Sequence, residues 1–321
     1  MYAKSKKNLP RVLLAVACGW IVVGCSPSSD GNDNTNGDGN DNTNVNGDGN
    51  DNTNGGGDPA EFTAADGIRG GQLYDKFWAS ETGFDQDDPN RDTFDASSNF
   101  FRCKQCHGWD LLGNLGAYID RAPRTSRPNV TGIDLAEHAQ EESAQDLFDS
   151  IKTGSGVPRR DADADLSMYD PDDSSTTALG DQMPDYGQIL TDEQIWDLVK
   201  FLKEEALDTT ELYDITTTGS YPDGSKTFSA IGKDGDPTNG DAIFADGCAS
   251  CHGADGTQFL VDGDEFTMGS FFRSKPNEAQ HKVKFGQLGT GMVPPAVQVD
   301  NLSDMKDLYR AMLDEDLYPD P

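Results

Sequence analysis

Two short strings with the same pattern, C-x-x-C-H, constrain this chain more than any other feature. They are Cys103-Lys104-Gln105-Cys106-His107 and Cys248-Ala249-Ser250-Cys251-His252, and a glycine follows each of them. This pattern is typical of sites where a c-type haem is attached. Two thiols three positions apart lie on one helical turn, so each can bond to a vinyl group of one porphyrin, and the adjacent histidine then faces the iron. The sequence therefore predicts two covalently bound c-type haems, with His107 and His252 as iron ligands.

The cysteine count agrees with this interpretation. Four of the six cysteines lie in the two motifs, and the other two, Cys18 and Cys25, lie near the N-terminus. A zinc ribbon could use two C-x-x-C pairs, but well over a hundred residues separate these pairs, which argues against one shared zinc site. A thioredoxin-like redox pair is the other alternative. It does not explain a histidine at the same position after both motifs.

The first 25 residues resemble a bacterial lipoprotein signal peptide. Four basic residues precede an apolar run over 12–23, which is too short to span a bilayer comfortably. The run ends at Gly24-Cys25, as in the lipoprotein processing box, so we predict a signal peptide over 1–24 and lipidation of Cys25. An ordinary secretory signal and an uncleaved anchor are the alternatives. Ser26 after the cysteine favours the outer membrane, with the protein on the periplasmic side.

Residues 25–60 predict a disordered tether. They contain almost no large apolar side chains and repeat Gly-Asn-Asp-Asn-Thr-Asn from positions 31, 39 and 49, so they cannot bury enough surface to fold. The alternative is a calcium site, because Asp30, Asn32 and Asn34 are spaced like the first ligands of a calcium loop. No acidic residue closes that loop at the required distance.

The chain is strongly acidic, with 57 acidic and 25 basic residues and a formal net charge of −32. Nucleic acid and anionic lipid are therefore poor candidates as partners. The charge favours a redox protein with a basic docking face, whose encounter with the chain slows as salt rises. Adaptation to salt is the alternative reason for the acidity.

Beyond the tether, the chain divides into two segments that each hold one motif. We place the first over 61–208 and the second over 235–321, with 209–234 as a connector rich in Thr, Gly, Asp and Ser. Each segment has a short opening helix, the C-x-x-C-H motif, a long loop, a methionine near proline and a closing amphipathic helix. The closing helices are predicted at 191–202, with a capping box at Thr191 and Gln194, and at 304–313.

This order resembles that of class I cytochrome c. The resemblance implies an all-α fold of two cytochrome c-like domains, each wrapped around one haem. Glycine-containing opening helices near 70–74 and 240–244 are similar to the first helix of that family. By the same resemblance, Met183, which precedes Pro184, and Met292, two residues before Pro294, are the second iron ligands.

Several residues compete for these roles. His138 could bind the first iron and His281 the second, and the remaining methionines lack the proline context. In the family, a proline carbonyl often orients the proximal imidazole, and Pro128 is the candidate in the first segment. The other methionines considered are Met168, Met268, Met305 and Met312.

If both irons carry histidine and methionine, neither has an open position for substrate, and one-electron transfer remains. The sequence therefore favours an electron carrier over an enzyme. The alternatives are a dihaem oxidoreductase similar to cytochrome c peroxidase or thiosulfate dehydrogenase, and a haem subunit of a dehydrogenase complex. The thiosulfate enzymes use a cysteine ligand at the active haem, and the mature chain has no spare cysteine except Cys25.

Overall fold

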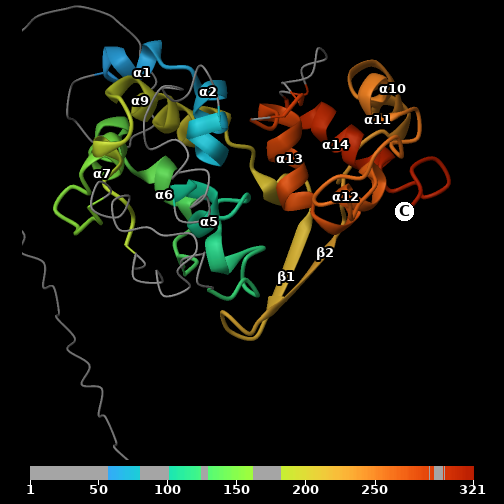
Figure 1. Cartoon of the computed structure of the whole chain (residues 1–321), viewed down its shortest axis with the longest axis horizontal. Coiled ribbons are helices and arrows are strands. Elements are labelled where there is room, and N and C mark those ends of the chain that lie inside the picture. The colour runs from blue at the N-terminus through green and yellow to red at the C-terminus, as the bar shows by residue number, and fades with distance from the viewer. Residues whose placement is uncertain are drawn as a thin grey trace, which may run out of the picture. The chain divides into compact units, whose positions relative to one another are not determined.

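The computed structural model of this chain describes residues 57–79, 101–123, 129–161, 182–288, 290–292, 299 and 301–321. These residues fall within one compact unit that spans Gly55–Pro321 (Figure 1). The predicted signal peptide, Cys25 and nearly all of the predicted tether lie outside the described residues. None of the helices in the described part is long and apolar enough to cross a membrane.

The described residues before 212 form helices and loops. Two helices contact each other at their centre, α2 (Gly67–Lys76) and α9 (Asp192–Lys200), and the first haem motif forms the short helix α5 (Cys103–His107). The remaining elements are α1 (Ala60–Ala64), η1 (Phe77–Ala79), η2 (Gly113–Leu115), α6 (Leu135–Glu141), α7 (Ala144–Lys152), η4 (Tyr186–Gln188), the π-turn η5 (Phe201–Glu205) and η6 (Thr209–Glu211).

The capping box predicted for the first closing helix is confirmed. The Thr191 hydroxyl accepts from the Gln194 amide at 3.3 Å, and the Gln194 side chain accepts from the Thr191 amide at 2.9 Å. Two of the N–H groups that a helix leaves unpaired at its start are therefore satisfied. The apolar face of α9 is buried, as its spacing predicts, and Trp196 stacks on Phe148 with ring centroids 4.3 Å apart.

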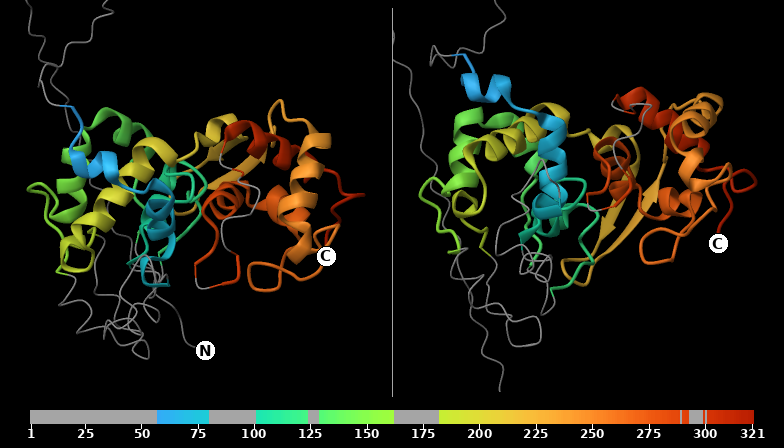
Figure 2. Two further views of the ribbon diagram at one scale, coloured as in Figure 1. Left: turned by 90° about the horizontal axis from the view of Figure 1, so that it is seen from above. Right: turned by 45° about the horizontal axis from the view of Figure 1, so that its top comes forward.

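A two-stranded antiparallel sheet departs from the all-α prediction and lies in the predicted connector. β1 (Asp214–Thr218) pairs with β2 (Ser225–Ser229), with Ile215 opposite Phe228. Ile215 and three threonines give β1 the β-branched side chains that favour strands. The hairpin packs Ile215, Tyr221 and Phe228 on the loop after the first haem motif, against a small cluster around Trp109. Figure 2 shows both strands extended beside that loop.

The described residues after the hairpin, which we call the second half, also form helices, and the described residues before 212 are the first half. The second half contains α10 (Pro237–Gly247), the second motif in α11 (Ala249–His252), α12 (Met268–Ser274), α13 (Pro276–Phe285) and α14 (Leu302–Ala311). The closing helix α14 begins two residues before the predicted start, because the Asn301 side chain accepts from the Asp304 amide at 2.8 Å and caps it.

The opening and closing helices meet in the same way in both halves. In the first half, the Asp66 amide donates to Asp197 Oδ1 at 2.8 Å, and Asp66 caps α2. In the second half, the Asp236 amide donates to Asp307 Oδ1 at 2.6 Å, and Asp236 caps α10. A carboxylate of each closing helix thus satisfies the start of each opening helix.

Close approach of these helices requires glycine. A Cβ atom at Gly70 would overlap the Asp197 carbonyl oxygen, and one at Gly240 would overlap the Asp307 carbonyl oxygen. Any larger residue would separate α2 from α9 or α10 from α14. The glycines that the sequence placed in the two opening helices are therefore explained by helix crossing.

Two large apolar cores hold the described residues together. The first contains Tyr74 and Phe201, and the second contains Phe244 and Tyr309. Helix α13 contributes to both, because Phe285 lies in the first core while Ala279 and Val283 lie in the second.

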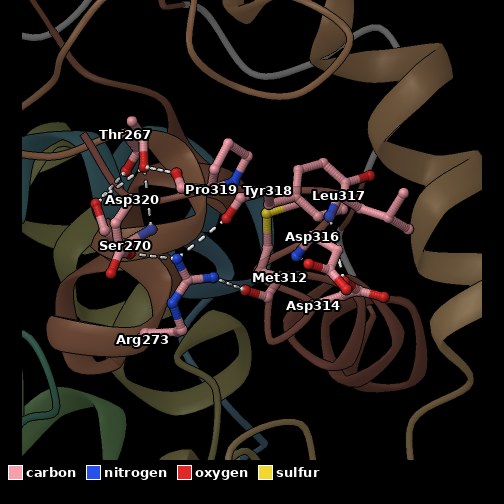
Figure 3. A network of polar contacts seen from close by, with 10 residues as sticks. All are labelled: Thr267, Ser270, Arg273, Met312, Asp314, Asp316, Leu317, Tyr318, Pro319 and Asp320. Carbon is pink, nitrogen blue, oxygen red and sulfur yellow. Dashed lines mark hydrogen bonds and ion pairs between the residues drawn. The ribbon is translucent and has the colours of Figure 1, made fainter.

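The C-terminal residues are fastened to α12 by a polar network (Figure 3). The Arg273 guanidinium donates to the carbonyl oxygens of Met312 and Tyr318 at 2.6 and 3.0 Å and to Asp320 at 2.5 Å. The Thr267 hydroxyl donates to the Pro319 carbonyl at 2.6 Å. This places the Tyr318 ring edge-on against Phe244 of α10, 5.0 Å away, so the chain end closes the second core.

Candidate haem sites

Each C-x-x-C-H motif forms one short helix that ends at the following glycine. Gly108 has φ 80° and Gly253 has φ 84°, a region that glycine enters at low cost. Their amides donate back to the carbonyls of Lys104 and Ala249 at 3.0 and 2.9 Å, which closes the last turn. The glycine after each motif is therefore required by the backbone that presents the histidine.

The first site is an apolar cavity that Cys103, His107 and Met183 all line. Its lining is mostly apolar with a few polar groups, as is usual for cofactor pockets. The other lining residues come from α2, α6, α7, α9, η5 and the intervening loops: Tyr74, Ile133, Leu135, His138, Leu147, Ser150, Ile151, Arg159, Leu198 and Leu202.

The chemistry of this cavity fits a covalently held haem. His107 Nδ1 is buried without a hydrogen-bond partner among the described residues, and burial lowers the pKa of this imidazole to about 4. A neutral imidazole has the free lone pair that an iron ligand requires. Burial also raises the pKa of the Cys103 thiol to about 12, so its environment suits a neutral sulfur such as a thioether. Pro128, predicted to orient His107, lies outside the described residues.

The loop that carries Met183 is anchored by Arg160. The Arg160 amide donates to the Met183 carbonyl at 3.1 Å, the Asp185 amide donates to the Arg160 carbonyl at 2.9 Å, and the Arg160 Nε donates to the Gln182 carbonyl at 2.6 Å. These bonds form a short parallel bridge between residues 160 and 184. Arg160 could not be predicted from the sequence, because nothing local links it to a loop more than twenty residues away.

Both candidates for the second ligand of the first iron reach the cavity. Met183 and His138 line it, from the anchored loop and from α6 respectively. Met168, a further candidate, lies outside the described residues. Met183 therefore stays a prediction, supported by its place on the same cavity as His107.

At the second motif, His252 is also buried and its Nδ1 has no hydrogen-bond partner among the described residues. Burial lowers the pKa of this imidazole and raises that of the Cys248 thiol to about 11. The Phe259 ring lies 4.8 Å from the His252 ring, and Cys251 is exposed. These features parallel those at His107, except that Cys251 is exposed whereas Cys106 is half-buried.

Met292 lies in a turn, where its amide donates to the Thr290 hydroxyl at 3.1 Å and its carbonyl accepts from the Gln287 amide at 2.8 Å. Residues 293–298, which include Pro294, lie outside the described part, and ligation by Met292 stays a prediction. Met305 and Met312 are fully buried in the second core, and Met268 packs there as well.

His281, the alternative ligand for the second iron, has a different environment. It is 1% exposed, and its Nε2 lies 2.9 Å from the carbonyl oxygen of Gly71 in the first half. Since a carbonyl oxygen only accepts, this nitrogen carries the proton and has no lone pair for iron.

Asp110, just after the first motif, is another buried titratable group. Burial raises its pKa to about 6, against the lowering effect of the Ala117 amide, which donates to it at 2.7 Å.

Comparison with known protein families gives one match: residues 94–205 match the family described as Cytochrome c. The matched range contains the first motif, Met183 and helix α9, so this segment is similar to a cytochrome c domain, a type of domain that carries covalently bound haem c. No curated protein and no solved structure matches the chain.

Proposed function

We propose that this chain is a membrane-anchored cytochrome that carries two c-type haems and passes single electrons between redox proteins on the periplasmic side. The observation that supports it most is the apolar cavity with Cys103, His107 and Met183 on its wall, inside the range that matches cytochrome c. The haem would supply a one-electron iron couple there.

The residues of the first site have separate tasks. Burial keeps His107 neutral, and Cys103 and Cys106 would hold the haem ring beside it. Leu147 and Leu198 exclude water from the cavity, and the Arg160 bridge holds Met183 on its wall. A thioether ligand in an apolar pocket favours reduced iron and raises the potential.

A second haem at His252 is supported by recurring local geometry. The glycine after the motif has the same φ, the histidine again has a buried Nδ1 without a partner among the described residues, and the helices around it cross at glycine as in the first half. The greater exposure of Cys251 favours a second haem that is nearer to solvent.

The proposal of an anchor at Cys25 and of a basic partner rests on the sequence and its net charge of −32. Replacing Cys25→Ala should abolish labelling by radioactive fatty acid and move the cytochrome from the membrane to the soluble fraction. Retention of label would refute lipidation at this residue. Reduction by a basic partner should slow as salt rises, because exposed charges are screened beyond about 8 to 10 Å at 0.10 to 0.15 M salt.

The spectrum of the oxidised holoprotein tests the function. Intact mass should show two haems, and the iron–methionine charge-transfer band should fall by half in Met183→Ala and in Met292→Ala. Met305→Leu is the matched control, because this methionine lies in the second core and should leave the band unchanged. A high-spin iron in the unmutated protein, or a band that neither variant alters, would contradict the carrier.

A further inference from the structure

Helix α13 is buried on nearly all sides. Its buried residues include the polar side chains of Gln280, His281 and Lys284. A helix that is buried all round has neighbours on opposite faces. Here these neighbours are the two apolar cores, since Phe285 packs in the first and Val283 in the second. α13 therefore packs against both halves of the described chain.

Three polar side chains of α13 bond to backbone carbonyls of the first half. Gln280 Nε2 donates to the Trp109 carbonyl at 2.8 Å, Lys284 Nζ to the Glu205 carbonyl at 2.8 Å, and His281 Nε2 to the Gly71 carbonyl at 2.9 Å. Buried polar groups left without partners are costly, so these bonds select one arrangement of the helix.

His281 lies at the centre of a cluster of rings, which we call the junction cluster: Tyr74, Trp109, Phe201, His281 and Phe285. The centroid of the His281 ring is 4.7 Å from the centroid of the Phe285 ring and 4.9 Å from that of Trp109. It is 5.8 Å from the ring centroids of Tyr74 and Phe201.

The junction cluster is continuous with the first haem site. Trp109 is two residues beyond His107, and Tyr74 lines the haem cavity. The Tyr74 hydroxyl donates to the carbonyl of Gly108, the glycine that ends the motif, at 2.6 Å. A helix from the second half of the chain thus contacts the residues that shape the first haem motif.

Contact at the junction is too close for a larger side chain. A Cβ atom at Gly71 would overlap the Phe285 ring, and the Gln72 side chain donates to the Phe285 carbonyl at 3.2 Å. The two halves are therefore joined by a fitted, buried surface.

We propose that His281 is a positioning residue, which locks α13 against the first haem motif so that the two haem-bearing halves move as one body. The proposal rests on the proposed function. With both haems bound, an electron passing from one iron to the other would cross a constant separation, with no proton or other reactant consumed.

The test compares three variants of the holoprotein. His281→Ala removes the ring and the bond to Gly71, and His281→Gln keeps an N–H donor of similar reach. Phe272→Ala is the matched control, because Phe272 is a buried ring in the second core, edge-on to Tyr309 and away from the junction cluster. Calorimetry and pulsed electron paramagnetic resonance between the two ferric irons are the measurements.

We expect one thermal transition in the unmutated protein and two in His281→Ala, with a broader distribution of iron–iron distances. His281→Gln should restore the single thermal transition and the narrow distribution of iron–iron distances. Phe272→Ala should also keep the single transition, at a lower temperature, and the narrow distribution. A single transition and an unbroadened distribution in His281→Ala would overturn the proposal. Mass spectrometry counts the haems independently, so the absence of a second haem refutes the function while calorimetry still decides the junction.

Discussion

The charge state of His281 predicts how the stability of the folded chain depends on pH. Burial lowers the pKa of this imidazole to about 4, against its usual 6.5, and outweighs the nearby Asp75 carboxylate, which favours the charged form. Lys104 and Lys282 also face the ring and oppose its protonation. The perturbation is His281→Gln, which keeps a donor for the Gly71 carbonyl and cannot titrate.

The sign follows from proton uptake. Below pH 6.5 the unfolded chain binds a proton at this histidine, while the folded chain remains neutral there until about pH 4. Stability from the neutral imidazole is therefore complete above pH 6.5 and is lost as the pH falls to about 4. At about 1.4 kcal/mol per pH unit, the loss is about 3 kcal/mol.

Urea unfolding of the holoprotein, followed by circular dichroism between pH 7 and pH 4, measures the effect. Relative to His281→Gln, the unmutated protein should lose about 3 kcal/mol of unfolding free energy over this range. Other titrating groups are present in both proteins, and their contributions cancel in the difference when they lie outside the cluster. Parallel stability curves for the two proteins would refute a buried, neutral His281.

Two further predictions concern the helix crossings and a second buried titratable group. Gly70→Ala and Gly240→Ala should each lower the unfolding free energy by about 1–3 kcal/mol, since each adds a methyl group where a backbone oxygen already lies. Gly291→Ala is the control, because its methyl group would lie in open space and should change the unfolding free energy little. Equal losses at all three positions would contradict the argument that the helices cross at glycine. Asp110 has the opposite pH dependence to His281, because its pKa is raised from 3.8 to about 6. The stabilisation from its neutral carboxyl group is therefore complete below pH 3.8 and is lost as the pH rises through 6. Compared with Asp110→Asn, the unmutated protein should lose about 3 kcal/mol of unfolding free energy as the pH rises from about 3 to 7. A difference between the two proteins that urea unfolding finds unchanged across that range would refute this prediction.

Much of the first haem site could be predicted from the sequence, because its signals are local. The spacing within C-x-x-C-H places the thiols and the histidine on one turn, and Gly108 ends that turn with the φ that only glycine adopts easily. The capping box at Thr191 likewise requires only residues three positions apart. The place of Met183 on the cavity came from resemblance to a family, and the cavity supports it.

The junction and the hairpin could not be predicted, because they depend on distant residues. His281 has a single neighbour in its own helix within the cluster, Phe285, and its other ring partners lie far away in the sequence. The connector is rich in turn-forming Gly, Asp and Ser as well as Thr, and this composition obscured two short strands. Ile215 and Phe228 of those strands are partly buried by distant residues, in the cluster around Trp109 and in the second core.

The shared helix also bears on how the second half gains its stability. A segment as short as 235–321 buries a modest core by itself. Yet α13 places the Phe285 ring, 1% exposed, among residues of the first core, and buries His281 and Lys284 against first-half carbonyls. Separated from the first half, that face would expose an aromatic ring and leave polar groups without their partners. The second half therefore depends on the first for part of its fold, and the same surface that completes its core sets its position relative to the first haem.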